Sequence, residues 1–258
     1  MSDVPSFFGF VLVLVGLLYV GGPMAMLAMF KFRCPARILF FAKSEISLPG
    51  DVAAYMDPLS AELEELGFEP VSYFCLPDVV SGAKSISVLF SNTAAGEGAI
   101  VNCIYADSLG GMSLKDKHVE FVTRFRDGMC VQTNNGNQLS AFTAPPEDHT
   151  VQYPDVEDVA ELYRRHRKIC DRLTTAPRRF RLAEEFHNDI EQYIQIAVIR
   201  EPIEYQVSRG LFRPAAEGYR LTVLGAFRMT WQELFPWKFI RIQRRDANAR
   251  RWLAEIGG

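Results

Sequence analysis

Residues 5 to 30 form an unbroken run without a charged side chain, PSFFGFVLVLVGLLYVGGPMAMLAMF. About 20 helical residues cross the roughly 30 Å hydrocarbon core of a bilayer, so this run is long enough to span one. A backbone in lipid must satisfy its own hydrogen bonds, which predicts a helix. Gly21, Gly22 and Pro23 predict a kink towards its end. The sequence therefore predicts a transmembrane anchor over residues 1–30.

The residues on either side of this run indicate whether it is cleaved and how it is oriented in the membrane. A cleaved signal peptide begins with positive charge, has a shorter apolar core and ends in small residues, and none of these features is present here. We therefore expect an uncleaved single-pass anchor. Lys31, Arg33, Arg37 and Lys43 follow the run, whereas no Lys or Arg precedes it. By the positive-inside tendency, the N-terminus lies outside and the C-terminal domain in the cytoplasm.

The five cysteines fit that compartment. Cys34, Cys75, Cys103, Cys130 and Cys170 are widely spaced, and the chain contains no C-x-x-C pair. Such spacing does not favour a zinc knuckle and is typical of free thiols in a reducing environment. The sequence also lacks the G-x-S-x-G, H-E-x-x-H and Walker patterns. We therefore predict no cofactor and no metal, and the sequence leans away from an enzyme.

Alternating side chains dominate the middle of the chain. They predict strands near 68–76, 84–91, 98–107, 117–127, 129–134 and 148–153. In KHVEFVTRFRDG, one face would carry Val119, Phe121 and Phe125, and the other His118 and Glu120. Two polar residues on one strand face can share a metal, but a cross-strand polar pair is the more common arrangement. The pattern is that of an antiparallel sheet with one wet face.

Helical periodicity flanks the strands. Asp57-Pro58 predicts the start of one helix and Asp155 the start of another. The fold class is therefore α+β, with an antiparallel five- to six-stranded sheet flanked by helices and a helical C-terminal region. Residues 31–50 read as a juxtamembrane connector, residues 51–174 as the sheet domain, and residues 175–258 as a basic, mainly helical region.

The C-terminal region starts with a predicted amphipathic helix that ends near Glu201-Pro202. The following stretch, GLFRPAAEGYRLTVLG, resembles the wing and next helix of winged helix-turn-helix proteins. The resemblance implies a DNA-binding regulator. The preceding helix is too long and unbroken for a helix-turn-helix pair, so the sequence does not favour nucleic acid as a partner.

The middle and the C-terminal part of the chain differ in net charge. Residues 51–163 hold 18 acidic and 5 basic side chains, whereas residues 164–258 hold 11 acidic and 19 basic ones. In the basic C-terminal part, aromatic side chains interleave with arginines, which is typical of a membrane interface facing anionic lipid. A helix that packs its aromatics into a soluble core is the alternative. The predicted membrane-interface residues are Lys31, Arg33, Arg37, Trp231, Phe235, Trp237, Lys238, Arg241, Arg244 and Arg245.

These features favour a binding or scaffold module held at the bilayer. Its acidic sheet face would take a protein or a small ligand, and its basic helices would contact lipid. A membrane-proximal enzyme with a site on the sheet is the first alternative, because catalytic groups can come from distant positions. A membrane-tethered winged-helix regulator is the second. A closed, polar-lined cavity containing His118 and Glu120 would overturn the preference for a non-enzymatic module.

Overall fold

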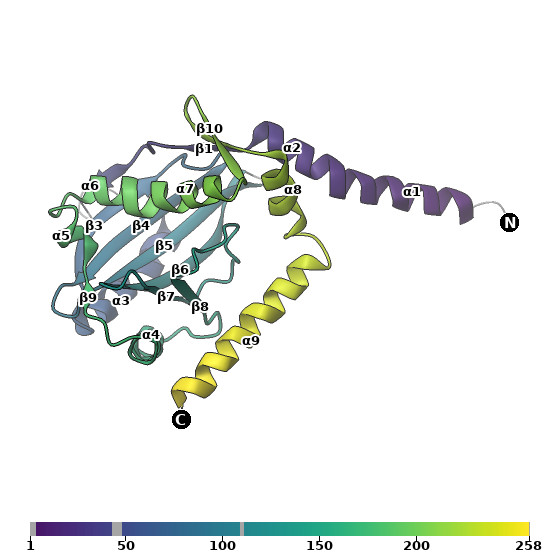
Figure 1. The fold of residues 1–258 in the computed structure, drawn as a ribbon. Helices are drawn as coiled ribbons and strands as arrows, with labels where there is room; N and C mark the ends of the chain where they lie inside the picture. The colour runs from purple at the N-terminus through teal and green to yellow at the C-terminus, as the bar shows by residue number, and fades with distance from the viewer. Residues whose placement is uncertain (1–3, 43–47, 109–110, 258) are drawn as a thin grey trace.

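A computed structural model describes residues 4–42, 48–108 and 111–257, so Lys43 lies outside the described residues. Its N-terminal helix runs through α1 (Val4–Gly16), η1 (Leu17–Gly21) and α2 (Gly22–Met29), and its α1 part points away from the body (Figure 1). The π-helical turn η1 ends at Gly21, the first residue of the segment where the sequence predicts a kink. Within the described residues, Gly9–Met29 is the one helix long and apolar enough to cross a membrane.

The central sheet carries the predicted strands. In the part of the chain that the structure describes it has eight strands, seven of them in the order β2-β3-β4-β5-β6-β7-β8. Their bounds are β2 Leu39–Phe41, β3 Glu69–Leu76, β4 Ala83–Asn92, β5 Glu97–Ser108, β6 Gly111–Phe125, β7 Cys130–Asn134 and β8 Asp148–Gln152. The short β9, Arg178–Arg179, pairs with β6. The α+β class is confirmed.

Two details of the sheet differ from the prediction. Strands β2 and β9 have three and two residues, which is too few for an alternating pattern to reveal. The last pair, β7 with β8, is parallel, because residues 135–147 cross back before β8 begins. The predicted alternation in β6 is confirmed, since Val119, Phe121 and Phe125 are buried.

Helices α3 (Gly50–Glu65) and α4 (Val159–Leu173) pack on one face of the sheet with the end of α9 (Trp237–Gly257). The predicted starts of α3 and α4 were wrong. Helix α3 begins at Gly50 and carries Pro58 in its interior. Helix α4 is capped by Asp158, whose side chain accepts a hydrogen bond from the backbone N–H of Glu161, and not by Asp155.

The other face of the sheet, predicted to be wet, is covered as well. The short α5 (Arg181–Glu184) is followed by a continuous helix made of α6 (Ile190–Tyr193), η2 (Ile194–Arg200) and α7 (Glu201–Ser208) (Figure 1). The predicted single helix is broken at His187 and Asn188, which have positive φ angles of 50° and 65°. It also continues past Pro202, because proline is tolerated in the first turn of α7.

A small three-stranded sheet joins the N-terminal apolar helix to the C-terminal region. It pairs β1 (Lys31–Arg33) with β11 (Gly218–Leu221), and β11 with β10 (Phe212–Ala215). Helix α8 (Val223–Trp231) then packs along α2. Gly22 permits this close approach, because a Cβ at that position would lie 3.2 Å from the Thr230 methyl group.

Gly225 in the first turn of α8 makes the closest contact of this region. A Cβ there would lie 2.0 Å from the backbone oxygen of Leu211, which no side-chain movement relieves. We expect Gly225→Ala to lower the free energy of unfolding by about 3 kcal/mol, the upper range for overpacking. Gly50→Ala is the matched control, since nothing lies within 4 Å of a Cβ there. Equal denaturation midpoints for the two variants would contradict this packing.

Candidate functional site

A pocket of about 840 Å³ opens between the polar face of the sheet and the helices that cover it. Strands β6, β7 and β8 form its floor, and α7, α9 and the loop 136–145 form its walls. The alternation of β6 turns Asp116, His118, Glu120 and Arg124 towards it. Segments far apart in the sequence thus surround one pocket, which contains both His118 and Glu120.

His118 is held by hydrogen bonds on both ring nitrogens. Its Nδ1 lies 2.8 Å from Asp116 Oδ2, and its Nε2 lies 3.3 Å from Asn102 Nδ2. Because an amide nitrogen only donates, Nε2 must accept, and the ring proton therefore sits on Nδ1 and is donated to Asp116. The Ser87 hydroxyl donates in turn to Asn102 Oδ1 at 2.7 Å. This chain fixes the ring and occupies both of its nitrogens.

Glu120 forms a cross-strand polar pair. Its Oε2 accepts a hydrogen bond of 3.0 Å from Asn134 Nδ2 on β7. Burial raises the pKa of the Glu120 carboxyl, and the His118 ring and the Asn134 hydrogen bond oppose this with smaller effects. No group of three or more potential metal ligands occurs within the described ranges, and the His118 contacts are to Asp116 and Asn102.

Two further acceptors line the pocket, Asp148 in its floor and Gln206 in its wall. Burial raises the pKa of Asp148, and Arg124 opposes this with its Nη1 3.9 Å from Asp148 Oδ1. That oxygen and Gln206 Oε1 have no hydrogen-bond partner among the residues that the structure describes. Gln206 itself is 1% exposed and donates from Nε2 to the backbone oxygen of Thr143 at 2.9 Å.

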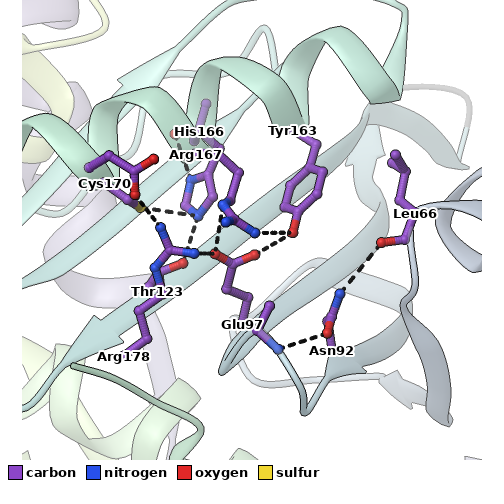
Figure 2. A network of polar contacts seen from close by, with 12 residues as sticks. Leu66, Asn92, Glu97, Thr123, Tyr163, His166, Arg167, Cys170 and Arg178 are labelled. Atoms are coloured by element: carbon purple, nitrogen blue, oxygen red, sulfur yellow. Dashed lines mark hydrogen bonds and ion pairs between the residues drawn. The ribbon is translucent and has the colours of Figure 1, made fainter.

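A second polar network lies between α4 and the sheet, and two of its arginines, Arg167 and Arg178, also line a separate surface pocket of about 580 Å³. His166 is fully buried between Thr123 Oγ1 at 2.8 Å and Thr133 Oγ1 at 3.0 Å. Figure 2 shows Glu97 facing Tyr163, Arg167 and Arg178. These contacts tie α4 and the segment before α5 to β5, so we interpret the network as structural. His166 is therefore a hydrogen-bonded histidine of the core.

The aromatic members of the predicted membrane interface cluster where α8 turns into α9. We call residues 231–239 the elbow. Trp231 donates from Nε1 to the backbone oxygen of Tyr19 in the apolar helix at 2.7 Å. Phe235 and Trp237 are 77% and 51% exposed and therefore do not pack into a soluble core. The elbow thus lies beside the apolar helix and continues its apolar surface.

The basic residues of the predicted membrane interface fall into three groups: exposed, paired with an acidic residue, or turned towards the pocket. Lys31, Arg37 and Arg244 are exposed, and Arg33 pairs with Asp78. Lys238 pairs with Glu233 of the elbow. The remaining two turn towards the pocket: Arg241 donates to the backbone oxygen of Ser140 at 2.5 Å, and Arg245 to that of Asn137 at 3.4 Å. Helix α9 therefore links the elbow to the pocket loop.

Comparison of the chain with protein-family models, with curated proteins and with solved structures finds no match. The pocket is therefore interpreted from its own geometry. Sequence reasoning singled out His118 and Glu120 but missed Asp148 and Gln206. The period-2 pattern of β6 could have added Asp116, whereas no local signal marks Gln206, which reaches the pocket only through the packing of α7.

Proposed function

We propose that the protein is a membrane-anchored binding module whose pocket takes a small polar ligand. The observation that carries this proposal is the cavity of about 840 Å³ with Glu120 in its floor. Its size falls within the roughly 300–1,000 Å³ of small-molecule sites. A flat scaffold surface would not gather buried carboxyl, amide and imidazole groups around one hollow. A protein partner on the outer surface of the domain stays the alternative occupant.

The anchor and the elbow support the membrane part of the proposal. The apolar helix is uncovered over most of its length, and an exposed apolar surface of that size needs lipid around it. Tryptophan and phenylalanine of the elbow suit the interfacial layer. The basic residues after the helix favour a cytoplasmic domain, and the five free cysteines agree with a reducing compartment.

A pocket-filling variant tests ligand binding. Ala197 of η2 lines the pocket, whereas its neighbour Val198 does not and is 39% exposed. We expect native mass spectrometry of the full chain released from membranes to show a bound small molecule at one per chain. Ala197→Trp should lose this molecule and Val198→Trp should keep it. A wild-type chain without added mass, or equal loading of both variants, would count against the proposal.

A membrane-proximal enzyme is the second candidate, favoured by one observation. Glu120 is a carboxyl with a burial-raised pKa inside a pocket, which is typical of a general acid or base. His118 is less suited to this role, because Asn102 and Asp116 occupy its nitrogens. Prolonged incubation of the loaded wild-type protein distinguishes the two functions: an enzyme converts the bound mass to a product mass, whereas a binding module leaves the bound mass unchanged.

A DNA-binding regulator has less support. The hairpin β10–β11 exists, but β1 covers its edge. Within the described residues, α5 covers only Arg181–Glu184 and the next helix runs on to Ser208, so two full helices in a helix-turn-helix arrangement are not found before Gly210.

A further inference from the structure

We infer that the ligand of this pocket is a small organic cation that bears ammonium or guanidinium N–H donors. The inference rests on the proposed function and gives its ligand a chemical class. It is carried by the charges that line the cavity and by how they are paired. The acidic lining residues are Asp116, Glu120, Glu147, Asp148 and Glu201, and the basic ones are Arg124, Arg241 and Arg245.

Two of the three arginines are already engaged by partners of their own. Arg241 donates to Glu233 Oε1 at 3.1 Å and to the backbone oxygen of Ser140. Arg245 donates from Nε to Asp246 Oδ1 at 2.9 Å. An anionic ligand would have to compete with these carboxylates for both guanidinium groups. The third, Arg124, has Asp148 as its ion-pair partner.

The acidic residues are paired less completely. Arg181 neutralises Glu201 with two hydrogen bonds of 2.7 Å, and Asp116 accepts from His118. Among the described residues, no Lys or Arg forms an ion pair with Glu120, whose hydrogen-bond donor is the amide of Asn134. A buried carboxylate without a cation is costly, so a positively charged ligand group beside it would be strongly favoured.

Two side-chain oxygens of the pocket without hydrogen-bond partners also favour a ligand that donates hydrogen bonds. Asp148 has a side chain only 9% exposed, and its Oδ1 accepts no hydrogen bond from the described residues. Gln206 Oε1, in the wall formed by α7, also has no hydrogen-bond partner among the described residues. Both residues line the pocket. Both oxygens only accept, and an ammonium or guanidinium group supplies donors and no acceptor.

The test uses the full chain in nanodiscs of zwitterionic lipid, with agmatine and spermidine as cationic probes. Inositol is the neutral probe and citrate the anionic one. We expect a cation to raise the melting temperature and to bind with a measurable Kd in calorimetry, whereas inositol and citrate do not. Glu120→Gln should weaken cation binding at least tenfold, and Asp148→Asn should also weaken it. Glu69→Gln, at an exposed position of β3, is the charge-matched control.

Several outcomes overturn the inference. It fails if neither cation binds, if Ala197→Trp does not block the cation, or if Glu120→Gln binds like Glu69→Gln. Binding of inositol or citrate that Ala197→Trp abolishes would refute the cation class and leave the binding module intact. The same holds if the molecule detected by native mass spectrometry carries no positive charge. Absence of any such molecule counts instead against the proposed function.

Discussion

Acidification from pH 6 to pH 4 is expected to destabilise the domain through His166. Burial, with smaller effects of Arg178 and Arg167, lowers the pKa of His166 to about 3. An unfolded histidine titrates near 6.5, so below that pH the unfolded chain binds a proton that the folded chain excludes. Stability is therefore lost as the pH falls from about 6.5 towards 3, by about 1.4 kcal/mol per pH unit for this group.

The measurement is denaturant unfolding at each pH for the wild type, His166→Gln and the control His187→Asn. His187 is exposed and has a φ of 50°, which asparagine tolerates. Other groups also titrate in this pH range. The prediction therefore concerns the difference between the wild type and His166→Gln in how much unfolding free energy each loses on acidification. We expect the glutamine variant to lose less stability than the wild type between pH 6 and 4. Parallel pH profiles for the wild type and His166→Gln would show that the ring is not buried as described.

Replacing Glu97 with leucine is expected to lower the free energy of unfolding by about 3–5 kcal/mol, the range for breaking a buried ion pair. Glu97 is 1% exposed and accepts hydrogen bonds from Tyr163 and Arg178, both at 2.5 Å. Without it, Arg178, which is 16% exposed, keeps only Asp171 as a charged partner. The loss follows mainly from an arginine left buried without its main carboxylate.

Asp171→Asn provides the matched control, because Asp171 also pairs with Arg178 but is 65% exposed. Exposed pairs contribute about 0–1 kcal/mol, so its unfolding free energy should stay close to that of the wild type. A loss at Asp171 equal to that at Glu97 would mean that burial does not decide the strength of these contacts. Urea denaturation at neutral pH measures both variants.

The strands were predictable because they are long and half-buried. In β6, the residues from Val119 to Phe125 alternate cleanly between the core and the polar face. Helix boundaries were less predictable, since capping signals compete: Asp57-Pro58 resembles a start, yet α3 begins at Gly50. Packing against the sheet stabilises the earlier turns and overrides the local preference.

The pocket was only partly predictable. His118 and Glu120 follow from one strand pattern, and their shared face is a local property. The walls come from α7 and α9, which lie far along the chain and reach the sheet through tertiary packing. Tertiary packing also gives two predicted interface arginines, Arg241 and Arg245, contacts with the pocket loop. Sequence alone does not distinguish an arginine that faces lipid from one that turns inward.

The proposed seating of the domain at the membrane is tested most directly by tryptophan quenching in vesicles with brominated acyl chains. One variant of the full chain keeps only Trp237 of the exposed elbow, and the other keeps only Trp252, which is 5% exposed in the core. We predict strong quenching of Trp237 and little quenching of Trp252. Equal, weak quenching of both would contradict an elbow seated in the membrane interface.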